Sequence, residues 1–95
     1  MIIAMKKIGV ILDSRPLGRE AWLGMRPSIR PDPDEAVLVD FEGVNLLTPS
    51  FADEFLTCLL EAFPGRVQYL NVRPGSIVDR TIQFLTPEWS ERSLV

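Results

Sequence analysis

Three carboxylates and one serine are the residues of this chain whose types and positions could support chemistry. Asp40 ends an apolar run, and Ser50, Asp53 and Glu54 follow in AVLVDFEGVNLLTPSFADEFLTCLLEAF, residues 36–63. A serine at a helix start can carry a phosphate, because the free amides and the helix dipole there favour negative charge. Carboxylates near strand ends can instead hold Mg²⁺. The segment therefore offers two alternatives, a phosphorylation switch at Ser50 and a metal site formed by the carboxylates.

Each of these residues also has a structural interpretation. Ser50 and Asp53 approximate a capping box, in which the serine hydroxyl accepts a hydrogen bond from a first-turn amide and contributes about 1 kcal/mol. Asp40 is expected to cap a turn, and Asp53 and Glu54 to interact favourably with the helix dipole. We favour these interpretations and predict no metal ion and no cofactor. If Ser50 is phosphorylated instead, repulsion by the two acids could be the switch; Thr48 is a second phosphoacceptor candidate.

Two arginines and a lone cysteine complete the candidates. Arg15 and Arg19 lie four positions apart at the start of a predicted helix, where positive charge is slightly unfavourable. They would contact an anion or a partner, or Arg19 would pair with a surface acid such as Asp13 or Glu20. Cys58 lies at the border of an apolar helix face and is expected to behave as a small hydrophobic residue.

The composition excludes several classes of function. The 95 residues are enough for one domain, and their hydrophobic share of 46% is that of a globular protein. With 10 basic and 13 acidic residues interspersed, the chain lacks the basic surface that nucleic acid requires. The absence of histidine excludes Ser-His and Cys-His nucleophile pairs within one subunit, so no enzyme is predicted. One cysteine fits a reducing compartment, and no segment suits a membrane span, so we predict a cytoplasmic protein.

The elements that must position these residues alternate between strands and helices. Strands are predicted over residues 2–8, 36–41 and 66–72, and helices over 16–25, 50–63 and 76–86. The apolar run of the middle strand suggests a strand covered on both faces. Parallel strands joined by helices require right-handed crossovers. The chain is therefore expected to form a small α/β layer structure, with strand and helix repeated three times and a mostly parallel sheet.

Three local features refine this expectation. The predicted helix from Ser50 should pack inward through Phe51, Ala52, Phe55, Leu56, Leu59, Ala62 and Phe63, with Thr57 on the outward face. Residues 30–34, which are rich in proline and charge, should form an exposed connector. Pro87 should end the last helix, which gives a domain over residues 1–86 and a C-terminal tail over 87–95.

The sequences VLVDFEGV and SFADEF, with the loop between them, resemble the STAS-like domain family, small bacterial proteins mostly of unknown function. The resemblance covers about residues 2–85 and includes Ser14-Arg15 and Leu17-Gly18-Arg19. It implies a STAS-type α/β fold. Better-known relatives, the anti-sigma-factor antagonists, carry Asp-Ser-Ser-Gly at this helix start, and a partner kinase phosphorylates the second serine. Counted from Asp40, that serine corresponds to Ser50, although the segment 48–51 lacks the acidic residue and the glycine.

The resemblance implies a small regulatory module that binds another protein and switches partners, with phosphorylation of Ser50 or Thr48 as its control. The implied partner is an ATPase of the sigma-regulator kinase type. The predicted docking surface consists of Asn45, Leu47, Thr48, Ser50, Asp53 and Glu54. The alternative is a small metal-binding or enzymatic domain that uses Asp40, Asp53 and Glu54.

Overall fold

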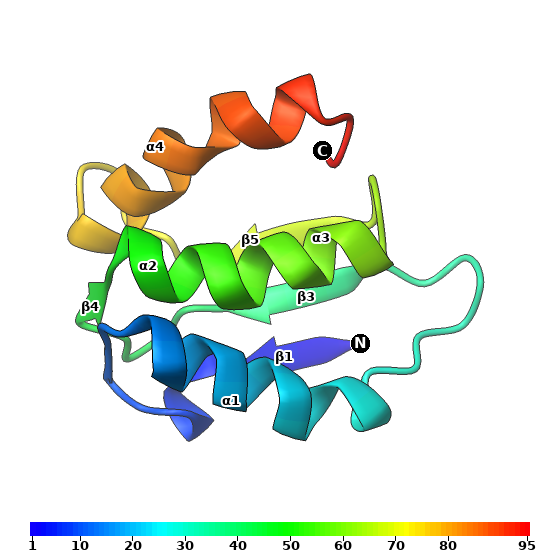
Figure 1. Ribbon diagram of the computed structural model, residues 1–95, viewed down its shortest axis with the longest axis horizontal. Coiled ribbons are helices and arrows are strands. Elements are labelled where there is room, and N and C mark those ends of the chain that lie inside the picture. Colours follow the sequence, from blue (N-terminus) through cyan, green and yellow to red (C-terminus); the bar gives the residue numbers. More distant parts are fainter.

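A three-stranded parallel sheet lies at the centre of the molecule (Figure 1). The structure is a computed structural model that describes residues 1–95. Its strands β1 (Ile2–Ala4), β3 (Val37–Asp40) and β5 (Val67–Leu70) lie in the order β1-β3-β5 and are joined by helices. The predicted α/β class, the threefold repeat of strand and helix and the parallel sheet are confirmed.

Helices cover one face of this sheet. Side chains alternate between the two faces of a strand, and Val37 and Val39 are fully buried beneath the helices. On the opposite face Ile2 is 62% exposed and aligns with Leu38, the half-buried side chain of the central strand. The expectation that the middle strand is covered on both faces is therefore wrong.

The first strand is shorter than predicted. It ends at Ala4, a 3₁₀ turn (Met5–Lys7) follows, and β2 (Ile11–Leu12) pairs in parallel with β4 (Leu46–Leu47) in a second small sheet. A continuous strand over 2–8 would send Lys6 and Lys7 to opposite faces, one of them beneath the helices. The turn instead leaves both lysines exposed.

The first helix, α1 (Arg15–Met25), forms where it was predicted. Ser14 caps it, because its hydroxyl accepts a hydrogen bond from the Leu17 amide at 3.1 Å, and a short 3₁₀ turn (Arg26–Ser28) follows. Four half-buried side chains of this helix pack against the core: Leu17, Ala21, Trp22 and Met25.

The helix after the central strand, called the central helix below, contains a π-helical turn. It runs as α2 (Pro49–Ala52), the π turn (Asp53–Thr57) and α3 (Cys58–Ala62). The predicted inward face is confirmed as far as Leu59. Because a π turn holds more residues than an α turn, the buried face shifts within the turn and after it: Thr57 and Leu60 are buried, and Ala62 is exposed. The predicted orientations of Thr57 and Ala62 are wrong.

The last helix, α4 (Ile77–Glu91), continues through Pro87, so its predicted end is wrong. Pro87 costs the helix about 3 kcal/mol relative to alanine. The burial of Trp89, which is 1% exposed, offers a stabilisation of similar size. Leu94, beyond the helix, also joins the core. Residues 87–95 therefore contribute two core side chains.

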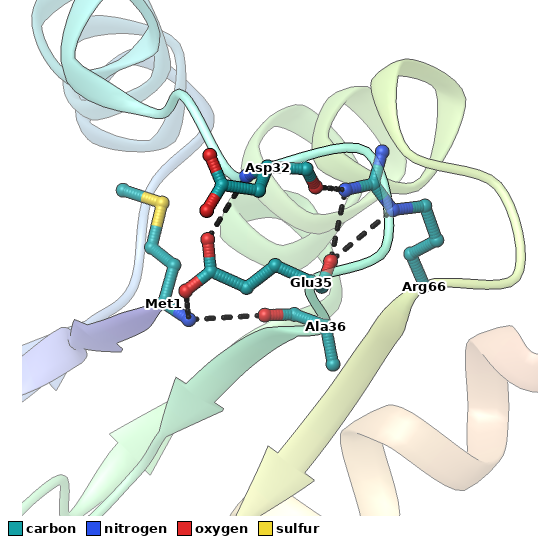
Figure 2. A network of polar contacts seen from close by, with 5 residues as sticks. All are labelled: Met1, Asp32, Glu35, Ala36 and Arg66. Atoms are coloured by element: carbon teal, nitrogen blue, oxygen red, sulfur yellow. Dashed lines mark hydrogen bonds and ion pairs between the residues drawn. The ribbon is translucent and has the colours of Figure 1, made fainter.

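The predicted connector is a loop whose end is tied to the sheet by the network in Figure 2. The Met1 ammonium donates to Glu35 Oε2 at 2.8 Å and to the Ala36 carbonyl at 3.1 Å. The hydrogen bond from the Met1 ammonium to the Glu35 carboxylate is the main reason why the pKa of Glu35 lies below its ordinary value. Arg66, at the start of β5, donates to the carbonyls of Asp32 and Glu35. The contacts hold the amino ends of three strands together.

Candidate functional site

Asp40 closes the turn at the carboxyl end of the central strand. Its Oδ1 accepts hydrogen bonds from the Glu42 amide at 3.0 Å and from Asn71 Nδ2 at 2.8 Å. The Asn71 amide and then the Glu42 amide lower the pKa of Asp40. Asn71 adopts φ +57°, a left-handed conformation that asparagine tolerates well. Asp40 thus caps the turn after β3, as predicted, and in addition joins it to the loop after β5.

Thr48, and not Ser50, caps the central helix. Its Oγ1 accepts a hydrogen bond from the Phe51 amide at 3.3 Å, Pro49 is the first helical residue, and Ser50 the second. Proline suits the first helical position because its φ is already helical and it has no amide to satisfy. The predicted cap at Ser50 is therefore wrong, and the Thr-Pro pair was the signal that could have corrected it. The Ser50 hydroxyl is exposed and forms no hydrogen bond.

Arg15 connects α1 to the first turns of the central helix. Its Nη1 donates to Asp53 Oδ2 and to Glu54 Oε1, both at 2.9 Å. The hydrogen bond to Asp53, followed by that to Glu54, raises the pKa of Arg15. The unfavourable position of Arg15 at its own helix start is thus offset by two acids from the neighbouring helix. Arg19 is exposed and forms no ion pair, so the alternative pairing with Asp13 or Glu20 is not found.

Two residues that the sequence interpretation missed extend this contact into the core. The Thr57 hydroxyl donates to Asp53 Oδ1 at 3.2 Å and accepts from the Trp89 indole nitrogen at 2.8 Å. Both side chains are buried. A regular helix would have placed Thr57 outward, and Trp89 was assigned to the tail. No local signal in the sequence identified either residue.

Gly18 brings α1 unusually close to the start of the central helix. A Cβ atom at this position would lie 2.7 Å from the Phe51 carbonyl oxygen and 3.1 Å from Glu54 Cβ. Any larger residue must therefore push the two helices apart. This close approach helps to fix the first turn of the central helix relative to Arg15.

The predicted docking surface is only partly exposed. Asn45 and Ser50 are exposed, and Thr48, Asp53 and Glu54 are half-buried. Leu47 is fully buried, so its inclusion was wrong: it pairs with Leu12 in the second sheet and its carbonyl accepts from Thr81 Oγ1. Thr48 uses its oxygen as a helix cap, which makes it the less suitable phosphoacceptor. The exposed part of the surface is therefore centred on Asn45 and Ser50.

The carboxylates do not assemble into a metal site. Asp53 and Glu54 share Arg15, whereas Asp40 bonds to Asn71. No three histidine, cysteine, aspartate or glutamate side chains lie together in a way that could hold a metal ion. The three-carboxylate arrangement considered as the alternative is thus not formed.

Cys58 is half-buried. Burial, followed by the nearby Glu61 carboxylate, raises the pKa of its thiol. Because the thiolate is the nucleophile, this environment opposes reactivity and agrees with the predicted role of a small hydrophobic residue.

A cavity of 480 Å³, not foreseen from the sequence, opens at the carboxyl ends of β3 and β5. Its walls come from the turn after β3, the loop after β5 and the start of α4: Phe41, Glu42, Gly43, Val44, Asn45, Asn71, Arg73, Ser76, Ile77 and Val78. This edge is where open α/β sheets commonly place their binding loops. Asn45 belongs both to the cavity wall and to the predicted docking surface.

Comparison with known families agrees with the predicted resemblance. The family model of a STAS-like domain of unknown function matches residues 29–74, which include the central strand, the central helix and β5. No curated protein and no solved structure gives a significant match. None of the helices combines the length and the apolar character needed to cross a membrane.

Proposed function

We propose that this protein is a small regulatory module that docks another protein through the start of its central helix, with Ser50 as the phosphoacceptor. The observation that carries the proposal is the free state of the Ser50 hydroxyl. It is exposed, it makes no hydrogen bond, and the capping role that would have explained it belongs to Thr48. A kinase could modify Ser50 without removing a cap.

The surroundings of Ser50 are compatible with a phosphate. Ser50 is the second residue of the central helix, where the dipole and free amides favour negative charge. Asp53 and Glu54 would oppose a phosphate, but Arg15 binds both carboxylates and offsets their charge. Phosphorylation would add about 1.5 to 2 negative charges to this surface. Such a change is large enough to reject one partner and admit another.

The partner we propose is an ATPase of the sigma-regulator kinase type. The support is the family match, which includes the loop and the whole central helix. The position of Ser50 adds to it, because, counted from Asp40, Ser50 corresponds to the serine that such kinases modify in antagonist proteins. Under this proposal the protein works in the bacterial cytoplasm, as a binding module and not as an enzyme.

Binding by Ser50→Asp and Ser50→Ala variants tests the proposal. Both variants are expected to keep the parent melting temperature, because Ser50 caps nothing. Ser50→Ala should still retain the partner ATPase in a pull-down from native cells, whereas Ser50→Asp should lose it. Ser28→Asp, at another exposed serine outside the central helix, is the matched control and should bind.

The bait recovered from the same cells should carry one phosphate by intact mass, and Ser50→Ala should remove it. Equal partner binding by the parent and Ser50→Asp, with no phosphate on the bait, would contradict the proposal.

A further inference from the structure

Four side chains form a continuous chain of polar contacts across all three helical segments. Arg15 of α1 donates to Asp53 at 2.9 Å, Thr57 donates to Asp53 at 3.2 Å, and Trp89 of α4 donates to Thr57 at 2.8 Å. This series of contacts leads from the surface into the core, because the Arg15 side chain is 52% exposed, whereas Thr57 is 6% exposed and Trp89 is 1% exposed. We call it the polar chain.

The chemistry of these groups fixes the direction of each bond. An ionised aspartate can only accept, so the single hydroxyl hydrogen of Thr57 is committed to Asp53. The Thr57 oxygen then presents a lone pair to the indole N–H of Trp89, which can only donate. Each bond therefore orients the next, and neighbouring hydrogen bonds in a protein interior polarise one another. A change at Arg15 can therefore alter the hydrogen bond of Trp89 through Asp53 and Thr57.

The second half of α4 depends on few anchors. Pro87 removes a backbone hydrogen bond from it, and Phe84 is 70% exposed. Trp89 is the residue that this half buries most completely. Just beyond the helix, Arg92 forms an exposed ion pair with Glu61 and Leu94 packs into the core. The position of this half should therefore respond to the contacts of Trp89.

We infer that the polar chain couples the docking surface to the second half of α4, and that Arg15 is the positioning residue through which the coupling begins. The part that concerns modification rests on the proposed function. Ser50 lies three and four residues before Asp53 and Glu54, so it shares their side of the helix. A phosphate on Ser50 competes for the Arg15 guanidinium, Asp53 loses its cation, and the bond between Thr57 and Trp89 changes.

The indole N–H signal of Trp89 in nuclear magnetic resonance reports the coupling directly. Trp22, which packs against Phe55 and lies outside the polar chain, supplies an internal reference, and Trp22→Phe assigns the two signals. In Arg15→Gln we expect the Trp89 signal to shift and its hydrogen exchange to quicken several-fold, with Trp22 unchanged. Arg19→Gln, on the same helix, should change neither signal.

Thr57→Val tests the middle of the polar chain. In this background, Arg15→Gln should cause no further shift of the Trp89 signal. Thr57→Ser keeps the hydroxyl, so in this variant Arg15→Gln should again shift the Trp89 signal. This second variant replaces the first if Thr57→Val does not fold. The inferred coupling would be overturned if Arg15→Gln left the Trp89 signal unchanged, or if Arg19→Gln shifted this signal by the same amount.

Phosphoserine incorporated at position 50 tests the modification separately, with phosphoserine at position 28 as its control. Only phosphoserine at position 50 should shift the Trp89 signal. In the Arg15→Gln variant, the same phosphoserine should cause no further shift. If Arg15→Gln shifts the signal and the phosphate at position 50 does not, the role of Ser50 in the coupling is overturned. Partner binding, measured independently, decides the proposed function itself.

Discussion

Two helix starts in this molecule share the pattern Ser-x-x-Asp, yet in only one of them do both residues cap the helix start. At α4, Ser76 Oγ accepts from the Asp79 amide at 3.1 Å, and Asp79 Oδ2 accepts from the Gly75 amide at 2.8 Å. Ser76 thus accepts from the amide of Asp79 itself, and Asp79 accepts from the amide of the residue before Ser76, an arrangement close to a capping box. At the central helix the same pattern, Ser50 and Asp53, makes neither bond.

The difference lies in the residues that precede each serine. Gly75 adopts φ +78°, which lets the chain turn sharply into α4 at Ser76. Pro49 instead is the first residue of the central helix, so the cap lies at Thr48, two residues before Ser50. The comparison teaches that a capping pattern specifies a helix start only together with the residue before it. A serine released from capping in this way is available for another role.

The largest difference between the two starts should appear in the residue that follows each serine. Phe51 is fully buried and stacks on Phe55 with ring centroids 5.9 Å apart, whereas Ile77 is 50% exposed beside the cavity. Phe51→Ala should lower the free energy of unfolding by about 3–5 kcal/mol. Ile77→Ala should change it by no more than about 0.5 kcal/mol. Urea unfolding measures both, and equal losses would show that the starts are anchored alike.

The close approach of α1 to the start of the central helix occurs at Gly18, and substitution of this glycine tests it. Gly18→Ala places a methyl group against the Phe51 carbonyl and should destabilise the protein by about 1–3 kcal/mol. Gly24→Ala, in the same helix with open space around it, should stabilise by about 0.5–1 kcal/mol. Thermal unfolding of the two variants decides the point. A stabilising Gly18→Ala would mean that the helices are not in close contact.

Alanine at each capping position sharpens the comparison itself. Ser76→Ala and Thr48→Ala should each cost about 0.5–2 kcal/mol, because each removes the acceptor for a first-turn amide. Ser50→Ala should stay within about 0.5 kcal/mol of the parent. The midpoints of denaturant unfolding measure these changes in stability, provided that the dependence of the unfolding free energy on denaturant concentration is the same in each variant. A loss at Ser50 as large as the loss at Ser76 would restore Ser50 as the cap.

The smallest effect concerns the turn after β3, which Asp40 caps, and depends on pH. The pKa of Asp40 is lowered in the folded protein, so its contribution is complete above the ordinary value near 3.8 and is lost as pH falls below it. Asp40→Asn keeps an acceptor for Asn71 but does not titrate. Between neutral pH and about pH 3 its melting temperature should therefore fall less than that of the parent. If the melting temperatures of Asp40→Asn and the parent fell equally with pH, the hydrogen bond between Asp40 and Asn71 would contribute nothing to stability.

Local patterns predicted much of the fold. The strand predicted over 36–41 and the helices predicted over 16–25 and 50–63 depend on neighbouring residues, and each forms within one residue of its predicted bounds. Where local and distant preferences disagreed, the prediction failed. Pro87 indicated a helix end, but the burial of Trp89 against the central helix outweighed it.

The candidate site was predictable in position and not in its contacts. Arg15, Asp53 and Glu54 were each selected because of charge near a helix start, yet their mutual pairing depends on how closely α1 approaches the central helix. That approach is set by Gly18, whose importance is visible only when Phe51 is placed beside it. Likewise, the exposure of Ser50 follows from one proline, whereas the burial of Leu47 follows from its pairing with Leu12 in the second sheet.

The π turn of the central helix has a consequence for the history of the chain. A π turn of this kind is what an ordinary helix becomes when it accepts one inserted residue and keeps both flanking faces in the core. Removing one residue from 53–57 would let the π turn close into an ordinary helical turn, so the segments on either side would keep the faces they now present. Leu59 and Leu60 would then stay in the core. A homologue with a one-residue gap at this place should therefore keep the sheet and the Phe51 anchor, but lack the spacing that joins Asp53 to Thr57 and Trp89.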